Sequence, residues 1–322
     1  FVTEQVSKIT EGDDGIKRDY VAAVGYFQKA SAQDYDPSTY NLASAYWYGT
    51  GGLPKDQKKA FSLFEKTANN GLPEGQHILA IMYLDGEGVT ADIPKGMTWL
   101  TKAAQANHPP AQSLLGSIYI YGDYNQTMSV DKAIPWLEQA AAARDQQAAI
   151  MMFILTTEGV GTPADPAKAS QWYQIVTEKF YENKEQKAQL LIGIQYIDGL
   201  GPVRDSQKGV VWLEKAANAN YSDAQAVLGN MYFSGNGVGK DVYKAASWLK
   251  KLDENKDAGV NEDFLKGHYN LGTMYTHGIG VTKDLSKARS CMITVFVNGD
   301  KTYAKKARDW ADKHNNGVLL DK

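Results

Sequence analysis

Short phrases recur along this chain at a nearly constant spacing, and this repetition constrains the fold more than any other feature. The phrase GEGVTADIPKG begins at Gly86, and GIGVTKDLSKA begins at Gly278. A period of 36 to 43 residues separates the small residues that open successive units: Ser38, Gly75, Ala111, Ala148, Ala188, Ala224 and Gly267. Such a period is typical of stacked helical hairpins, because one hairpin cannot bury its apolar face alone.

The first half of each unit predicts a helix, which we name helix A. In one unit Leu79, Ala80 and Tyr83 follow the opening small residue at spacings that place them on one helical face. The small residue next to the leucine, here Ala80, lets a neighbouring helix approach closely, and the tyrosine fills the space beside it. A glycine such as Gly86 then ends the helix, because glycine accepts the left-handed conformation that helix ends often require.

The second half of each unit predicts helix B, which begins after an acidic or hydroxyl residue. Asp and Ser are favoured at helix N-caps, where their oxygens accept hydrogen bonds from unpaired backbone amides. We therefore interpret the regular acids as caps rather than metal ligands: Asp19, Asp56, Asp92, Asp165, Asp205, Asp241 and Asp284, with Ser129 in the remaining unit.

One position of helix B holds an aromatic or apolar residue that we expect in the core. Five of the seven tryptophans occupy it, which argues against a role as ligand platforms. The position is held in turn by Tyr26, Leu63, Trp99, Trp136, Trp172, Trp212, Trp248 and Cys291. Cys291, the single cysteine, is therefore expected to be a buried thiol rather than a nucleophile.

The combined order LGxMYxxG, GxGVxxD and KAxxWLxKAA resembles the Sel1-like repeat family, a relative of the tetratricopeptide repeats. The resemblance extends from Gly15 to Met292. It implies an all-α, right-handed α-solenoid of about seven helix-turn-helix repeats with a C-terminal capping helix. We expect one solenoid over residues 1–322, with a partial repeat over 1–37, repeats over about 38–74, 75–110, 111–147, 148–187, 188–223, 224–266 and 267–299, and a cap and tail over 300–322.

Some segments depart from the pattern. Phe153 stands where a small residue belongs, and Thr156 stands where the tyrosine belongs, so this unit must pack differently. Insertions follow helix B in VTEKFYENKEQKA and in LKKLDENKDAGVNEDFLKG, and extra length in a solenoid usually forms loops used for binding. The segment from Asp300 to His314 reads as an amphipathic cap with Trp310 inward, after which Leu319 and Leu320 can fold back.

Composition excludes several classes of function. A net charge of −3 provides no basic footprint for nucleic acid. The longest apolar run, AAIMMFILTT, is roughly half of the twenty residues needed to cross a bilayer. The chain begins at Phe1 without a signal peptide, which we interpret as a trimmed or mature fragment.

No catalytic, metal or cofactor constellation is predicted. Ser247 and Lys250 match the Ser-x-x-Lys of penicillin-recognising enzymes, and Ser234 with Asn236 faintly echoes their Ser-x-Asn. Both matches lie inside the repeat pattern and no Lys-Thr-Gly follows, so we interpret them as coincidental. The five histidines lack metal-ligand spacing.

The residue before each turn glycine varies while its surroundings stay constant. We name this set, with the neighbouring Trp47, the variable stripe, and expect it on the concave, A-helix face: Trp47, Tyr48, Asp85, Tyr121, Glu158, Asp198, Ser234 and His277. Exposed tyrosines anchor many interfaces, and the acids in the middle favour a partner with Lys or Arg. The alternative is a merely solvated face.

These residues predict a non-catalytic scaffold or adaptor that binds another protein. The family resemblance implies two alternatives: an immunity protein that neutralises a secreted toxic effector such as a lipase, and a penicillin- or peptidoglycan-interacting protein or hydrolase. It also implies a periplasmic location, with the cytoplasm as the alternative, and an envelope assembly component as another partner. We expect no cofactor, no nucleic acid and no membrane span.

Overall fold

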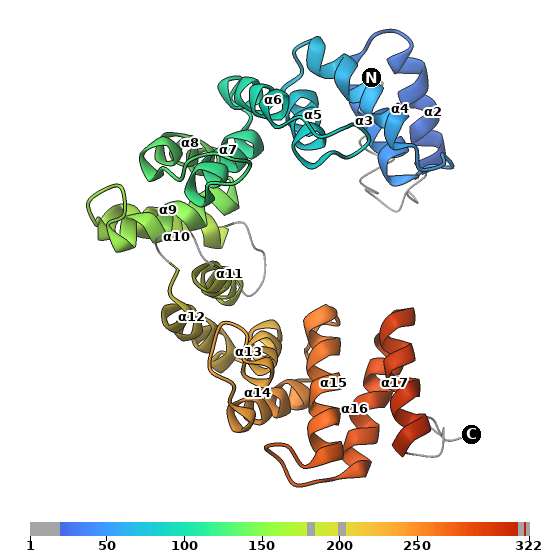
Figure 1. The fold of residues 1–322 in the computed structure, drawn as a ribbon, viewed down its shortest axis with the longest axis vertical. Helices are drawn as coiled ribbons and strands as arrows, with labels where there is room; N and C mark the ends of the chain where they lie inside the picture. The colour runs from blue at the N-terminus through green and yellow to red at the C-terminus, as the bar shows by residue number, and fades with distance from the viewer. Residues whose placement is uncertain (1–19, 179–183, 199–203, 315–318, 320–322) are drawn as a thin grey trace. The chain divides into compact units, whose positions relative to one another are not determined.

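The computed structural model describes residues 20–178, 184–198, 204–314 and 319. These residues form helices joined by turns and loops, with no strand among them (Figure 1). The all-α prediction is therefore confirmed. In chain order the helices are α2 (Tyr20–Ser31), α3 (Asp36–Tyr48), α4 (Gln57–Asn69), α5 (Pro73–Asp85), α6 (Ile93–Gln105), α7 (Pro109–Tyr121), α8 (Val130–Ala142), α9 (Gln146–Glu158), α10 (Pro166–Glu178), α11 (Lys184–Asp198), α12 (Ser206–Asn218), α13 (Ser222–Ser234), α14 (Val242–Glu254), α15 (Glu262–His277), α16 (Leu285–Asn298) and α17 (Lys301–His314).

The helices follow the predicted alternation. Each odd-numbered helix from α3 to α15 is an A helix, and the even-numbered helix after it is its B helix. Within a hairpin the two helices lie side by side, as α5 and α6 or α13 and α14 do (Figure 1). Contacts divide the chain into two compact units, Phe1–Met152 and Phe153–Lys322. That all repeats act as one domain over 1–322 stays a prediction.

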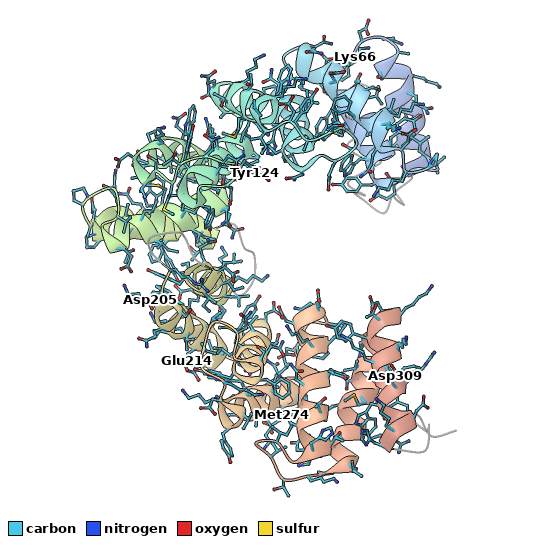
Figure 2. The ribbon with its side chains drawn as sticks, in the orientation of Figure 1. Lys66, Tyr124, Asp205, Glu214, Met274 and Asp309 are labelled. Carbon is cyan, nitrogen blue, oxygen red and sulfur yellow. The ribbon has the colours of Figure 1, made fainter. Side chains whose placement is uncertain are left out.

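The ends of the helices are fixed by the residues predicted to fix them. Gly86 adopts the left-handed conformation at φ 74°, and its amide donates to the carbonyl of Met82. Asp205, labelled in Figure 2, lies at the start of α12, and its side chain accepts hydrogen bonds from the backbone amides of Gln207 and Lys208. The same capping occurs at Asp56, Asp92, Ser129, Asp165, Asp241 and Asp284, whereas Asp19 lies outside the described residues. The predicted capping role is confirmed for the described members of this set.

The expectation that the tryptophans of helix B form the core is right only for Trp248. That residue is buried, whereas Trp99, Trp136, Trp172 and Trp212 are half-buried. The leucine after Trp99, Trp136 or Trp212 holds the core instead: Leu100, Leu137 and Leu213 are at 0% exposure. Indole rings are amphipathic, and lysines one turn later lie over three of them at 4.1–4.2 Å: Lys102 over Trp99, Lys215 over Trp212 and Lys251 over Trp248.

A glycine on helix A receives that core leucine. A Cβ atom built on Gly229 would lie 2.4 Å from Cδ2 of Leu249, and one on Gly116 would lie 2.6 Å from Cδ2 of Leu137. Ordinary carbon contacts are near 3.5–4.0 Å, so any side chain at either glycine would overlap the leucine. The small residue of the repeat therefore permits the close packing of the two helices, as predicted.

The hairpin of α9 and α10 replaces both members of that pair. Phe153 takes the glycine position, and Tyr173 takes the leucine position. Their ring centroids lie 5.6 Å apart, and Phe153 also makes an edge-to-face contact with Trp212 of α12 at 5.7 Å. The prediction that this unit packs differently is confirmed, and the compensating change at Tyr173 is a finding of the structure.

The C-terminal cap and tail are also as predicted. Helix α17 buries Ala307, Trp310 and Ala311, and the Trp310 indole donates a hydrogen bond to the Thr276 hydroxyl at 2.8 Å. Leu319 is buried, and its carbonyl accepts a hydrogen bond from Arg289. Leu320 lies outside the described residues.

Candidate partner-binding site

The variable stripe has a common structural origin. Apart from Trp47, every member is the last residue of its A helix, followed by the glycine of the turn. This position comes two residues after the tyrosine of helix A, or after the Thr156 that replaces it, so it has no place in the hairpin core. The helix end also carries partial negative charge from unpaired carbonyl groups.

The members of the stripe differ in accessibility. Tyr48 is the most open, with 72% of its surface exposed. Asp85, Asp198, Ser234 and His277 are exposed, whereas Trp47, Tyr121 and Glu158 are half-buried. The sequence predicted one variable face, and the structure separates its members into open and partly covered residues.

Asp85 is held by a neighbouring loop. The Tyr124 hydroxyl donates to Oδ1 of Asp85 at 2.7 Å. This hydrogen bond, together with burial and the nearby carboxylates, raises the pKa of Tyr124 to about 12. Tyr124 adopts a positive φ of 51°, and the turn around it lacks the Gly-x-Gly pattern of the other units. One of the three acids of the stripe therefore already accepts an internal hydrogen bond.

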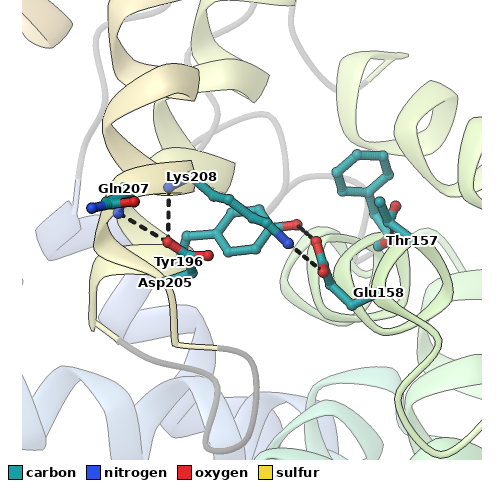
Figure 3. Close-up of polar contacts among 7 residues, drawn as sticks. Thr157, Glu158, Tyr196, Asp205, Gln207 and Lys208 are labelled. Atoms are coloured by element: carbon teal, nitrogen blue, oxygen red, sulfur yellow. Dashed lines mark hydrogen bonds and ion pairs between the residues drawn. The ribbon is translucent and has the colours of Figure 1, made fainter.

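Glu158 is more strongly engaged. The Tyr196 hydroxyl donates to its Oε1 at 2.8 Å, and the Lys208 ammonium binds its Oε2, as Figure 3 shows. The contact with Glu158 raises the pKa of Lys208, and burial followed by the same carboxylate raises the pKa of Tyr196. Glu158 thus joins the end of α9 to α11 and α12. Its negative charge is already paired with Lys208 within the chain, so it is less available to a basic residue of a partner.

Asp198 and Ser234 lie together at one depression of about 200 Å³. Its lining comes from the end of α11, the second half of α13 with the turn after it, and the first turns of α15: Ile194, Ile197, Asp198, Val227, Asn230, Met231, Ser234, Asn236, Asp263 and Lys266. We name it the α11–α13–α15 pocket. Sequence reasoning found two of its polar residues and missed Asn230, Asp263 and Lys266, because they lie on other turns of their helices.

His277 is partly engaged by the cap. Its Nδ1 lies 2.9 Å from the Thr273 carbonyl, and its ring stands edge-to-face to His314 of α17 with centroids 5.9 Å apart. The residue remains exposed. It therefore offers a ring edge beside the terminal helix rather than an isolated imidazole.

A second recurring feature was not predicted. The lysine three residues after an N-cap extends over the buried tyrosine of helix A. The Lys59 ammonium lies 4.3 Å from the Tyr46 centroid, and that of Lys244 lies 5.0 Å from the Tyr232 centroid. The signal was present in the sequence as the Lys of KAxxWL, which recurs in register with the tyrosine. These stacks cover the tyrosine faces and leave the last residue of helix A as the open one.

Two further depressions involve segments that depart from the repeat. One depression, of about 340 Å³, lies among three aromatic rings and the neighbouring parts of α9 and α10. Its lining residues are Phe153, Thr157, Pro166, Ala169, Ser170, Tyr173 and Trp212. The other, of about 540 Å³, is lined by the insertion between α14 and α15, where Asn261 donates to Asp223 at 2.7 Å and Asn255 donates to the Asn220 carbonyl at 2.9 Å. Both belong to the unit Phe153–Lys322. The first insertion, by contrast, includes residues 179–183, which lie outside the described residues.

The residues of the enzyme alternative show no catalytic arrangement. Ser247 and Lys250 are both exposed on α14. Ser234 donates to the Asn230 carbonyl at 2.8 Å, so its hydroxyl serves the helix end. Cys291 is buried, as predicted, and burial raises the pKa of its thiol to about 12. Among the described residues, no three His, Cys, Asp or Glu side chains gather in a way that could hold a metal ion.

None of the described helices is both long and apolar enough to cross a bilayer. The expectation that no such helix is present is confirmed for this part of the chain.

Comparison with known proteins places these observations in a family. A solved Sel1 repeat protein from Oxalobacter formigenes is 29% identical, with a TM-score of 0.54, and the match covers 79% of this chain and 99% of that one. A protective antigen of uropathogenic Escherichia coli with an SLR fold is 23% identical, with a TM-score of 0.49, over 99% of this chain and 80% of the antigen. An immunity protein from Pseudomonas aeruginosa is 20% identical, with a TM-score of 0.43, over 67% of this chain and 81% of that protein.

The family assignment rests on the repeats themselves. A model of the Sel1 repeat matches eight segments: 10–35, 37–72, 73–108, 109–145, 146–175, 186–221, 222–252 and 265–293. These segments make up most of the chain, and they follow the helical hairpins described above. The chain belongs to the Sel1 repeat family, and its fold is an α-solenoid of these repeats.

Proposed function

We propose that this protein is a non-catalytic scaffold that binds a partner protein along the variable stripe. The observation that carries the proposal is the shared position of the stripe residues at the ends of the A helices. The buried tyrosines, glycines and leucines perform the same packing role in successive hairpins, so the residue that varies is the one free to specify a partner.

The strongest candidate anchor is Tyr48. A large ring that is 72% exposed gains apolar burial on binding, and tyrosine loses little conformational freedom because it has few rotatable bonds. Tyr243 provides a matched comparison, since it is 76% exposed but lies in the first turn of the B helix α14. The two tyrosines differ in helix class and not in residue type or exposure.

The test begins with the full chain as bait in extracts of its source organism, followed by titration calorimetry with the purified companion. We expect Tyr48→Ala to weaken binding by roughly tenfold or more, and Tyr243→Ala to leave it unchanged. If Tyr243→Ala weakens binding while Tyr48→Ala and His277→Ala do not, the A-helix stripe is not the site.

The identity of the companion decides between finer roles. A single tight partner that is a secreted toxic effector would assign an immunity role, whereas several weaker partners would assign a general adaptor role. A periplasmic location stays a prediction from the family resemblance, and fractionation of the source organism tests it directly.

A further inference from the structure

The α11–α13–α15 pocket has a chemical character that the rest of the stripe lacks. Its floor is apolar, formed by Ile194, Ile197, Val227 and Met231. Its rim carries the carboxylates of Asp198 and Asp263 against the single ammonium of Lys266. The charged side chains of the rim therefore sum to −1.

The backbone adds to this negative character. Asp198 ends α11 and Ser234 ends α13, so two helix C-termini lie at the pocket. The last carbonyl groups of a helix carry partial negative charge, which favours a cation nearby. Ser234 and Asn236 add no formal charge: the Ser234 hydroxyl donates to the Asn230 carbonyl, and the backbone amide of Asn236 donates to the Ser234 hydroxyl.

Asn230 lines the pocket and joins α13 to α15. Asn230 is only 4% exposed; it donates to the Asp263 carbonyl at 3.1 Å and accepts from Asn270 at 2.9 Å. These bonds hold the first turn of α15 against α13 and fix Asp263 at the rim. Partial burial raises the pKa of Asp263, and Lys266 and Asn230 oppose this effect.

We infer that the α11–α13–α15 pocket receives an arginine or lysine side chain of the partner protein. The aliphatic stem would lie on the Ile, Val and Met floor, and the cationic head would reach Asp198 and Asp263 at the rim, as long basic side chains commonly divide their stem and head. This inference rests on the proposed function and narrows it. It assigns basic recognition to Asp198 rather than to Asp85 or Glu158, whose carboxylates already accept internal hydrogen bonds.

The pocket can be tested without the natural partner. The full chain, labelled at Ile, Val and Met methyl groups, is titrated with N-acetyl-arginine amide and followed by NMR. The control probe is N-acetyl-citrulline amide, which has nearly the same shape and no charge. We expect arginine to shift the methyl signals of Ile197, Val227 and Met231, and citrulline to bind at least roughly fivefold more weakly.

Variants locate the charge that is recognised. Asp198→Asn and Asp263→Asn keep the size of each side chain, and we expect each to weaken arginine binding by roughly threefold to fivefold. Asp309→Asn is the matched control, because it removes an exposed carboxylate of α17 outside both the stripe and the pocket, and it should leave the titration unchanged. Unaltered methyl spectra of the free variants show that they remain folded.

The outcomes separate this inference from the proposed function. Equal binding of citrulline, no response to arginine, or a response that both Asn variants leave intact would overturn the basic-side-chain assignment. If Tyr48→Ala still weakens binding of the partner in that case, the stripe stands and only the pocket assignment falls. If arginine binds as expected while Tyr48→Ala and His277→Ala leave partner binding unchanged, the pocket assignment is supported and the stripe proposal is contradicted.

Discussion

The regular hairpins and the α9–α10 hairpin solve the same packing problem with different residues. In α13–α14, Gly229 receives Leu249, and the two backbones approach closely. In α9–α10, Phe153 and Tyr173 occupy those two positions, and their rings pack against each other and against Trp212. The exchange of both partners shows that the repeat specifies a filled space between two helices rather than particular side chains.

The exception has consequences beyond its own hairpin. Thr156 stands where the other hairpins have the tyrosine, and Lys168 stands where they have the lysine that covers it. In the next hairpin, Lys208 does not stack in the usual way but binds Glu158, together with the Tyr196 hydroxyl (Figure 3). The stripe residue of the irregular repeat, Glu158, therefore takes part in a structural contact.

The largest expected effect comes from removing the exceptional ring. Phe153 is 8% exposed, so Phe153→Ala should lower the free energy of unfolding by about 3–5 kcal/mol, through lost burial and the cavity left behind. The double variant Phe153→Gly with Tyr173→Leu recreates the regular pair and should recover part of this loss. Urea unfolding followed by circular dichroism measures both. The loss of stability in the double variant should be smaller than the sum of the losses in Phe153→Gly and Tyr173→Leu alone. A larger loss would contradict the view that the two positions exchange as a pair.

The second-largest expected effect is a loss of stability at acid pH through His77 of a regular hairpin. Burial, and secondarily His108, lowers the pKa of His77 on α5 to about 4, whereas an unfolded histidine titrates near 6.5. Between these values the unfolded chain binds more protons, so stability is full above about pH 6.5 and falls as the pH drops toward 4, by about 3 kcal/mol from this group. Unfolding measured from pH 7 to 4 tests this, with His77→Phe as the control. An unchanged pH slope in that variant would assign the effect to other groups.

A methyl group added at a regular glycine should have a smaller effect. A Cβ atom on Gly193 would lie 2.8 Å from Cγ of Leu213 and 2.9 Å from the Gly209 carbonyl oxygen. Overpacking costs about 1–3 kcal/mol, and the better helix propensity of alanine offsets about 1 kcal/mol. We expect Gly193→Ala to lower the thermal unfolding temperature. Gly239→Ala, where no atom lies within 4 Å of the new methyl group, should leave it nearly unchanged; equal shifts would show that close packing is not the reason for the glycine.

The smallest effect distinguishes the two uses of the repeat lysine. Lys208→Met removes an ion pair with Glu158, and Lys244→Met removes a stack over Tyr232. Because both lysines are exposed, each change should cost no more than about 1 kcal/mol. Salt screens ion pairs more than ring contacts, so the cost of Lys208→Met should decline more in high salt. Thermal unfolding at low and high ionic strength measures the difference, and identical salt responses would contradict it.

The helices and their ends could be predicted from the sequence because each repeat contains the short-range signals that start and end its helices. The aspartate caps, the turn glycines and the terminal helix with Trp310 all follow from short-range patterns. Trp99 and Trp212 were mispredicted because hydrophobicity does not reveal that a lysine covers the ring while the next residue, Leu100 or Leu213, fills the core. Asp263 at the pocket was missed because its place depends on a contact between two hairpins, through Asn230.

The central claim is that a partner protein lies along the ends of the A helices, and hydrogen exchange of the complex tests it most directly. With the purified partner bound, amides near the ends of α3, α11, α13 and α15 should exchange more slowly than in the free protein. The first turns of the B helices, including α14 around Tyr243, should exchange at the same rate in both states. Protection confined to the B helices, with the A-helix ends unchanged, would contradict the account.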